Sequence, residues 1–497
     1  MKKSRTRRLN ILIGFFASVL LNAEGIDESQ YGIYQPGGYL IGAVEPGSEI
    51  YFKEKRLSYQ SNGLYVIGFD REDSGIQEIS FVDRVGGRRS QLLDIGSRQY
   101  NIQRINGIPA SKVTPEKRDE ERIYQEFEQV RFARGRQSSH SSWQQPFIWP
   151  LYGPITGVYG SQRVLNGIEK SPHFGVDVAR PIGTPVYAPN SGQIVLADDL
   201  YFSGNTVIID HGMGVLSTLM HMDDIVVLAG NSISQGDIVG HVGTTGRSTG
   251  PHLDWRINWN NIPIDPTFWV PPMTSICNPM VASSNNNKGK DEVVILFHGQ
   301  DPDGSTMDVL SRSLLKDGYV ICNQHYPSTQ YSLEQQSGYL ANAIAKAYQS
   351  GYARIHVVTH GSGGLIARYY LQGKKLPGDG VVVMLSPPSS RNDVVDQLGR
   401  YRWFDKIRGP AAIQLSTDAK ILSNRLKPIR SRVGIIMEEV STEPWFSFLF
   451  KGRFDTDVLM IFSNPPGKNS AKNQSLISDL ERIRQFLKNS EFSDERH

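Results

Sequence analysis

The sequence predicts a multidomain protein in which two all-β units are followed by a C-terminal α/β unit. Residues 37–103 contain short β-branched and aromatic runs separated by Gly, Pro and Asp clusters, which is typical of a small β sandwich. The same pattern returns between residues 147 and 272. Beyond residue 290, strand-like runs at 293–297 and 355–359 enclose helical patterns, which indicates a mostly parallel sheet. The 497 residues are too many for one core and suggest about three domains.

The N-terminal segment has the pattern of a secretory signal. Five basic side chains lie within the first eight residues, an apolar stretch follows at 9–21, and Ala23 supplies a small residue at the expected cleavage point. The stretch is shorter than the roughly 20 apolar residues that span a bilayer, and an uncleaved anchor is the alternative. No later segment of the sequence is apolar for long enough to span a membrane. We therefore expect an exported protein, located in the periplasm or cell envelope of a Gram-negative bacterium.

Charge and cysteine content narrow the class of protein. Removing the signal changes 53 basic and 50 acidic side chains to 48 and 50, and no basic stripe stands out in the remaining sequence. Nucleic-acid binders concentrate basic residues on one face, so we expect no nucleic-acid partner. Cys277 and Cys322 are the only cysteines, so disulfides cannot be the framework of the fold. Whether these two residues pair is left open by the sequence.

Composition shifts along the chain mark the domain boundaries. Thr114 at a cap position and Pro115 in the first turn predict a solvated connecting helix. A Ser, Asn and Gly stretch at 283–289 marks a second boundary. The chain is thereby divided into a signal peptide 1–23, an N-terminal β domain 24–113, a helical linker 114–146, a second β domain 147–272, a linker 273–290 and an α/β domain 291–490.

Two segments of the second β domain carry candidate metal ligands. His173 and Asp177 are four residues apart in a stretch that has prolines at both ends and valines between, which favours a strand. An even spacing on a strand places both side chains on one face, where they could reach one ion. Alone this pair is a weak signal, because such a spacing arises by chance in about every second chain of this size.

The second segment, at 249–257, alternates polar and apolar residues as a half-buried strand does. His252 and Asp254 lie on its polar face, within reach of the same ion if the two strands pair. His221 ends an apolar run, where a lone histidine is more often a core residue than a ligand.

The order of motifs in this domain resembles the lysostaphin/LytM peptidases over about residues 149–270. Several motifs in the right order are far more specific than any one of them. The motifs are Pro172-His173-x-Gly175-x-Asp177, Gly183-Thr184-Pro185-Val186-x-Ala188-Pro189, Ile209-Asp210-His211-Gly212, His221, and Gly243-x-x-Gly246-x-Ser248-Thr249-Gly250-Pro251-His252.

The resemblance implies a LytM-type fold with a Zn²⁺ ion held by His173, Asp177 and the last residue of a His-x-His motif. Here that last residue is Asp254, which is still a legitimate zinc ligand. Two carboxylates neutralise the formal charge of the ion, so we expect a weaker Lewis acid and better competition by harder divalent ions. His221 and His252 are expected to move protons and stabilise the oxyanion.

The remaining histidines of this domain, His211 and His241, stand at family positions that do not bind metal, and we expect structural roles for both. The turns at 243–250 are expected to shape a wall of the groove. The resemblance implies a zinc endopeptidase that cleaves the peptide part of peptidoglycan. Because Asp254 departs from the family pattern, the alternative is an inactive regulator of another wall hydrolase, with other envelope hydrolases or division proteins as partners.

The α/β domain resembles the lipase-like α/β-hydrolases. Residues 293–299 match the oxyanion-hole strand and loop, and residues 357–371 match the strand, turn and helix of the nucleophile elbow. In register, His360, Gly361 and Ser362 place glycine where the nucleophile belongs, and the sequence has no histidine between residue 360 and the last residue to act as base. We therefore expect a hydrolase fold without catalysis; an active esterase that uses Ser362 is the alternative.

Overall fold

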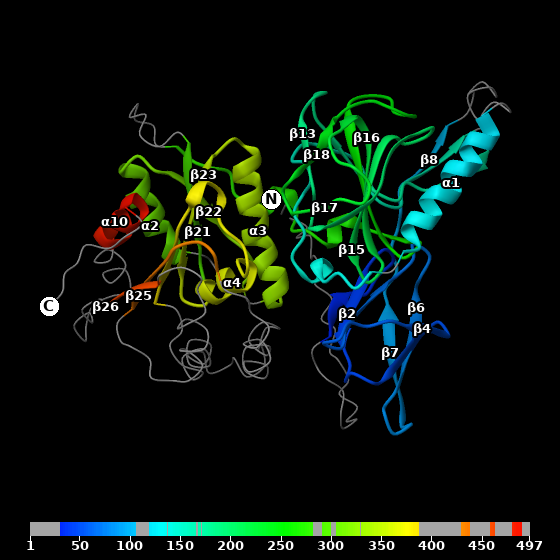
Figure 1. Cartoon of the computed structure of the whole chain (residues 1–497), viewed down its shortest axis with the longest axis horizontal. Coiled ribbons are helices and arrows are strands. Elements are labelled where there is room, and N and C mark those ends of the chain that lie inside the picture. Colours follow the sequence, from blue (N-terminus) through cyan, green and yellow to red (C-terminus); the bar gives the residue numbers. More distant parts are fainter. Residues whose placement is uncertain are drawn as a thin grey trace, which may run out of the picture.

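The computed structural model describes residues 30–105, 119–136, 138–165, 167–169, 171–281, 291–299, 305–328, 330–386, 429–437, 458–462 and 480–489. The predicted signal at 1–23, the helix start predicted at Thr114 and Pro115, and the Ser/Asn stretch lie outside these residues. None of the described helices is both long and apolar enough to cross a bilayer. Figure 1 shows the parallel-sheet unit beside the β-rich units, with helix α3 (Leu333–Gln349) at the boundary.

The N-terminal strands form two antiparallel sheets, in agreement with the predicted β content. Both sheets share one hydrophobic core with the second β unit, because residues such as Tyr65 and Phe69 pack in the same cluster as Trp255 and Trp259. The first sheet has the order β1 (Tyr31–Ile33), β2 (Tyr39–Ala43) and β5 (Leu64–Gly68). The second has the order β4 (Lys55–Leu57), β3 (Glu49–Phe52), β6 (Gly75–Val82) and β7 (Arg88–Ile95).

A ten-stranded sheet dominates the second β unit. Its main path is β17 (Ser232–Ile233), β14 (Gly192–Leu200), β15 (Gly204–Gly212), β16 (Val215–Ile225), β19 (His252–Trp259), β12 (Val176–Ala179) and β9 (Ile155–Gly157). Off this path lie β13 (Pro185–Tyr187), β18 (Ile238–Val242) and β20 (Ile262–Ile264). A separate small sheet joins β8 (Ile102–Ile105), β10 (Gln162–Leu165) and β11 (Ile168–Glu169).

The connecting helix α1 (Glu120–Arg134) is not fully solvated, in contrast to the prediction. Val130 and Ala133 pack against Leu196 and Leu200 of β14, which gives the helix a buried edge. The sequence did not predict this buried edge, because most side chains of the helix are charged and only a few apolar ones face the sheet. The helix therefore adds a layer to the outer side of the large sheet (Figure 1).

The C-terminal unit contains the predicted parallel sheet. Its order is β22 (Val320–Gln324), β21 (Glu292–Phe297), β23 (Arg354–His360), β24 (Val382–Leu385), β25 (Val433–Met437) and β26 (Val458–Phe462). Separate hydrophobic clusters cover its two faces, which is typical of a parallel sheet. One cluster includes α3 and α4 (Gly363–Tyr370); the other includes α2 (Ser305–Lys316) and α10 (Leu480–Asn489).

Helix α3 connects the parallel-sheet unit to the second β unit through buried polar contacts. The side chain of Asn342 accepts a hydrogen bond from the backbone N–H of Trp149 at 3.0 Å and donates one to the carbonyl of Phe147 at 2.9 Å. A disulfide joins Cys277, after the β unit, to Cys322 in β22, which answers the question that the sequence left open. The two units are therefore joined by a disulfide and by buried hydrogen bonds of the Asn342 side chain.

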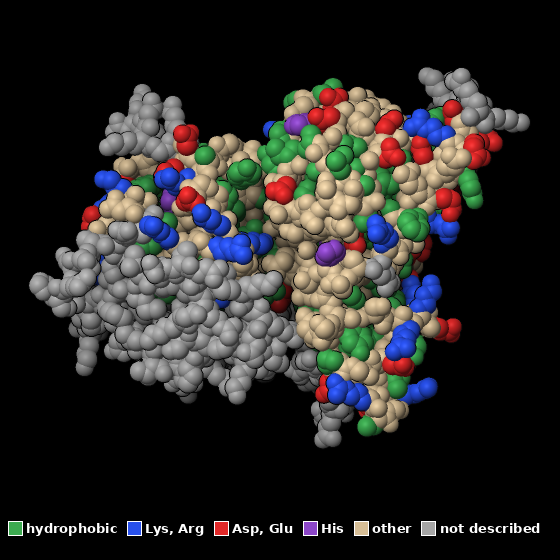
Figure 2. Space-filling view, in the orientation of Figure 1, with side chains coloured by type: hydrophobic (Ala, Val, Ile, Leu, Met, Phe, Trp, Pro, Cys, Tyr) green, Lys and Arg blue, Asp and Glu red, His purple; other side chains and the backbone are tan. Residues whose placement is uncertain are grey.

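On the face shown in Figure 2, acidic side chains lie among the basic ones on both halves of the molecule. The expected lack of a nucleic-acid partner stays a prediction.

Candidate metal centre

The three predicted ligands come together beside strands β12 and β19 of the large sheet. His173, Asp177 and Asp254 each offer an atom, and these atoms all lie within 4.8 Å of one another. Nε2 of His173 is 3.0 Å from Oδ1 of Asp177 and 3.3 Å from Oδ2 of Asp254. The structure thus brings together the residues that the sequence singled out, although their role as ligands stays a prediction.

The strand register explains why the two carboxylates face each other. Asp177 in β12 is the direct antiparallel partner of Asp254 in β19, so both side chains leave the sheet on the same face. The prediction for His173 was wrong in its local structure, because this residue precedes β12 and does not lie on the strand. A loop contact orients it instead: its Nδ1 lies 3.3 Å from the carbonyl of Val158.

The chemistry of this group fits a bound cation. The carbonyl of Val158 can only accept, so Nδ1 of His173 carries the proton in the neutral ring and Nε2 presents a lone pair. With the ring neutral, the buried Nε2 of His173 and the buried Oδ1 of Asp177 are two acceptors that face each other at 3.0 Å with no proton between them. Like charges directly opposite on neighbouring strands are destabilising. A cation between these atoms would remove both conflicts.

A proton is the alternative partner for the same lone pair. Burial opposes the charged form of His173, but hydrogen bonds and charges from Asp177 and Asp254 outweigh it and raise the pKa to about 10. A metal ion must displace that proton, so binding releases a proton and weakens at low pH.

The third ligand candidate has a partner that the sequence did not identify. Arg256 donates from Nε and Nη2 to the carboxylate of Asp254, with Nη2 to Oδ2 at 2.7 Å. Burial would raise the pKa of Asp254, but the charge of Arg256 and the contact with His173 lower it well below its usual range. The buried pair is close to neutral overall, so the excess negative charge expected from two carboxylates is largely offset.

A second arginine stands behind this pair. Arg134, at the end of α1, donates from Nη2 to the hydroxyl of Thr218 at 3.3 Å, and Thr218 is the register partner of Arg256. Burial lowers the pKa of Arg134 to about 10, and the nearby charge of Arg256 acts in the same direction. The connecting helix therefore reaches the neighbourhood of Arg256, the partner of Asp254.

His221 is placed by a bulge in β16, and the strand does not end there as the sequence indicated. Met220 and His221 together stand opposite the single residue Thr206. His221 has φ of 65°, a left-handed conformation that a residue with a side chain seldom adopts and that is found at functional sites. Its Nδ1 lies 2.9 Å from the carbonyl of Thr245, which leaves Nε2 as the free lone pair.

His252 lies beside His221, with 4.9 Å between the ring centroids. Nδ1 of His252 is 2.8 Å from the carbonyl of Gly250, so this ring also presents Nε2, which is 3.8 Å from Oδ1 of Asp177. Burial lowers the pKa of His221, which keeps its ring neutral and able to accept a proton. Two proton acceptors thus border the metal centre.

The other two histidines of this domain are occupied elsewhere. His211 is fully buried between the carbonyl of Ser191 and the hydroxyl of Ser217, and burial lowers its pKa to about 4. His241 pairs with Asp224 at 2.7 Å. Both are held by contacts away from the three candidate ligands.

A strand, a turn and a helix occupy residues 354–370 of the C-terminal unit, where the sequence predicted them. The strand order reverses at β21, and the carboxyl ends of β21 and β23 flank this switch point, where ligands of parallel sheets bind. Gly361 has φ of 55°, so glycine occupies the left-handed position of the turn between β23 and α4. A side chain at Gly299 would approach the backbone nitrogen of Ser362 at 2.8 Å, so the two segments lie against each other.

The same edge holds two histidines that the alternative esterase, based on Ser362, could use as bases. His298 and His325 follow β21 and β22, with 6.0 Å between their ring centroids. The argument from sequence had sought a base only after residue 360. Parallel strands bring residues that are distant in sequence to one edge, so earlier histidines also reach it.

Sequence reasoning assigned no role in the metal centre to Arg256 or Arg134. The sequence contains a pattern that could have pointed to Arg256, but none that could have pointed to Arg134. Arg256 alternates with His252 and Asp254 on β19, and strand periodicity alone places the three on one face. Arg134 reaches the site only because α1 docks on the sheet. The packing of one element on another by so few residues produces no periodic pattern in the sequence.

Part of the second β unit is similar to known peptidases. Residues 171–266 match the model of Peptidase family M23, so this part of the chain is a LytM-type M23 peptidase domain. The chain is 38% identical over 115 residues to the peptidoglycan DD-endopeptidase ShyA of Vibrio cholerae, which is 23% of this chain and 27% of ShyA. It is 34% identical over 123 residues to the DD-carboxypeptidase/endopeptidase Mpg of Neisseria meningitidis, 25% of this chain and 28% of Mpg.

These matches span less than a third of the length of each relative. Among solved structures, the catalytic domain of lysostaphin from Staphylococcus simulans is similar to this chain with 33% sequence identity. That similarity covers 23% of this chain and 90% of the domain, with a TM-score of 0.22.

Proposed function

We propose that this protein is a zinc metalloendopeptidase that cleaves the peptide cross-links of peptidoglycan. The observation that carries the proposal is the convergence of His173, Asp177 and Asp254 within 4.8 Å inside an M23 peptidase domain. One imidazole nitrogen and two carboxylate oxygens are ligand types that zinc accepts, and three protein ligands leave an open position for catalysis. Relatives named as peptidoglycan endopeptidases support the choice of substrate.

The residues of this chain divide the chemistry between holding the ion and moving protons. When bound, the ion supplies polarisation of the scissile carbonyl and acidification of a water. His221 accepts a proton at Nε2, because its Nδ1 is committed to the carbonyl of Thr245. His252, whose Nδ1 is committed to Gly250, offers a second Nε2 that stabilises the developing oxyanion once protonated.

Metal analysis together with zymography on purified sacculi tests the proposal. We expect about one zinc per chain after gentle purification, hydrolysis of the sacculi, and loss of hydrolysis after treatment with chelator that zinc restores. Hydrolysis that survives complete removal of the metal would contradict the metallopeptidase assignment. Release of glycan fragments without new amino termini would contradict cleavage of peptide bonds.

A second candidate function is that of an inactive LytM-type regulator that binds another wall hydrolase. The observation that favours it is the engagement of Asp254 by Arg256, which competes with the metal for the same carboxylate. A regulator need not hold metal. A chain that contains no zinc, degrades no sacculi, and stimulates a separate envelope hydrolase would support this alternative over the enzyme.

We also propose that the C-terminal unit is a lipase-like α/β-hydrolase fold that has lost catalysis. The backbone of the turn supports this fold, and Gly361 at its left-handed position lacks the nucleophilic hydroxyl. An active esterase based on Ser362 is the competing possibility, since His298 and His325 lie at the same sheet edge. Labelling by a fluorophosphonate that disappears in Ser362→Ala would establish the esterase instead.

The proposed substrate requires export, and the N-terminal pattern of the sequence supports it. We place the protein in the periplasm or cell envelope of a Gram-negative bacterium, with peptidoglycan and other envelope hydrolases or division proteins as partners. A reporter that is active only in the periplasm, fused after residue 30, should give a signal. Activity of a cytoplasm-dependent reporter at the same position would contradict export.

A further inference from the structure

Two arginines lie on the face of the large sheet that carries the metal centre. Alternate residues of a strand share a face, so Arg256 lies on the same side of β19 as Asp254. Thr218 of β16 is the register partner of Arg256 and therefore points to the same side. Arg134 of α1 donates to the hydroxyl of Thr218 at 3.3 Å, so its guanidinium group joins Arg256 on this face.

The packing of helix α1 places it on the same side of the sheet. Ala133, the neighbour of Arg134, packs in one cluster with Ile208 of β15. Ile208 is the register partner of Thr218, so it lies on the side of the sheet that Arg256 occupies. The helix thus forms a wall on the metal-centre face of the sheet, and Arg134 is the last residue of that wall.

Both guanidinium groups have N–H donors to spare, since each carries five. Arg134 makes one hydrogen bond, to the neutral hydroxyl of Thr218, and no ion pair with any described residue. Arg256 uses Nε and Nη2 on Asp254, which leaves its Nη1 without a partner in the described chain. Both side chains are partly exposed, 27% in Arg256, and among their unpartnered nitrogens only Nε of Arg134 is buried. Each Nη1 is therefore open to a ligand.

The charges on this face do not balance. Burial and the charge of Arg256 lower the pKa of Arg134, and Asp254 is the carboxylate that acts in the opposite direction. That carboxylate is already bound by Arg256 and, in the proposed enzyme, by the metal ion. Asp177 and Asp254 together match the charge of a divalent ion, so the two guanidinium groups then have no counter-charge of their own. A largely desolvated cation without a counter-charge is costly, which favours an anionic ligand.

We propose that Arg134 and Arg256 form a subsite for a carboxylate of the wall peptide. The inference rests on the proposed function and deepens it, because peptide cross-links differ in whether an ionised carboxylate lies near the bond to be cut. A planar carboxylate accepts two parallel N–H bonds from one guanidinium group, and two such groups can share it. The two arginines therefore select a cross-link that carries a carboxylate over a neutral one.

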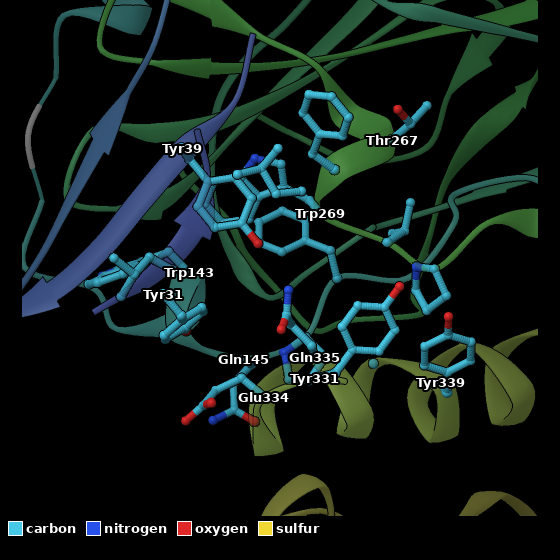
Figure 3. A pocket seen from close by; sticks show the side chains of 18 of the residues that line it. Tyr31, Tyr39, Trp143, Gln145, Thr267, Trp269, Tyr331, Glu334, Gln335 and Tyr339 are labelled. Carbon is cyan, nitrogen blue, oxygen red and sulfur yellow. The ribbon is translucent and has the colours of Figure 1, made fainter. Parts of the chain in front are cut away.

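The cavity in Figure 3 does not offer such a site. It has a volume of about 280 Å³ and is lined mainly by aromatic side chains such as Tyr39 and Trp269. None of the described residues that line it is Lys, Arg or His, and the acidic Glu334 is among them. An anionic group is disfavoured there, so the carboxylate of the substrate is assigned to the arginine pair.

Two synthetic cross-linked peptides test the subsite. They differ only at one carbon beside the cross-link, which carries a free carboxylate in one peptide and its neutral amide in the other. With the zinc-loaded full chain, we expect kcat/KM to be roughly 10- to 100-fold higher for the carboxylate peptide, the scale of a hydrogen bond to a charged group. Equal kcat/KM for the two peptides would overturn the subsite.

Matched variants locate the bound carboxylate. Arg134→Gln should lose most of the preference, because hydrolysis of the carboxylate peptide falls while that of the amide changes little. Arg134→Lys keeps the charge without the planar fork, so its preference should be intermediate. Arg131→Gln makes the same change on the same helix, at an exposed ion pair with Glu128, and should keep the preference of the wild type.

An equal loss of hydrolysis for both peptides in Arg134→Gln would mean that Arg134 has only a structural role, and this would overturn the subsite. If Arg134→Gln fails to fold, the preference measured in Arg134→Lys decides.

Binding separates this outcome from that of the endopeptidase proposal. Calorimetry with chelator-treated protein, which cannot hydrolyse the peptides, should show tighter binding of the carboxylate peptide than of the amide. This preference without any hydrolysis would remove only the enzyme, and equal hydrolysis of both peptides would remove only the subsite. Neither hydrolysis nor binding at millimolar peptide would remove both. Binding of inorganic phosphate as tight as that of the carboxylate peptide would overturn the assignment to a peptide.

Discussion

Irregular backbone occurs both at the metal centre of the M23 domain, where β16 has a bulge, and at the turn between β23 and α4. In the first, His221 takes up the left-handed conformation and brings an imidazole to the site. In the second, the left-handed residue is Gly361, which brings no reacting group. A backbone geometry that serves catalysis can therefore be present with or without a side chain that can react. Only the side chains that converge on the position distinguish the two cases.

The largest expected effect is in the ligand set. His173→Ala should lower zinc affinity by more than about 100-fold, because loss of an outer-shell partner already costs 10- to 100-fold and His173 is one of three direct donors. Sacculus hydrolysis should be lost with the metal. Measured zinc content and zymography check this. Full activity in the variant would contradict the assignment of His173 as a metal ligand, and the metal centre would then have no better claim to catalysis than the turn.

The next effect separates proton transfer from metal binding. His221→Ala should keep its zinc and lose hydrolysis by roughly 10² or more, the usual scale for a general acid or base. The matched control is His241→Ala, in the same domain but paired with Asp224, which should hydrolyse sacculi at close to the normal rate. Loss of zinc in His221→Ala would show that this residue is a ligand.

A smaller effect is expected from substitution of Arg256, whose positive charge offsets the negative charge of Asp254. Arg256→Met leaves the buried carboxylate without its counter-charge, so the metal-free protein should be less stable, by about 3 kcal/mol on the scale of a broken buried pair. Zinc should restore much of this stability, because the ion replaces the lost positive charge. Thermal unfolding with and without zinc measures both changes.

Arg354→Met is the control for that variant, since Arg354 makes an exposed ion pair with Glu292 and should have little effect. Equal destabilisation of Arg256→Met with and without zinc would mean that the ion does not sit beside Asp254. Asp254→His extends the comparison: it restores the family ligand, and we expect equal or higher zinc affinity.

The smallest effect is expected at the turn of the C-terminal unit. Gly361→Ser places a hydroxyl at the left-handed position at a cost of about 1 kcal/mol, and we expect no hydrolysis of short acyl esters because no base has been shown to activate it. Gly351→Ser is the control, since Gly351 also has positive φ and its added Cβ would meet nothing within 4 Å. Ester turnover that appears only in Gly361→Ser would show that His298 or His325 still acts as a base.

Sequence reasoning reached the strands and the convergence of His173, Asp177 and Asp254 because strand periodicity and motif order depend on neighbours along the chain. It misplaced His173 on a strand, since spacing alone does not separate a strand from the loop before it. It also missed the buried edge of α1 and the contact of Arg134 with Thr218. Both depend on how one element docks on another, and few residues take part.

The bond between Cys277 and Cys322 keeps the two parts of the chain joined after a cut in the segment between them. The two residues are 45 positions apart, and one belongs to the segment after the M23 domain while the other lies in the parallel sheet. A protease that cuts once anywhere between them leaves two fragments on a single covalent molecule. The two fragments separate on a gel only after a reductant is added, so a cut between Cys277 and Cys322 is detected only under reducing conditions.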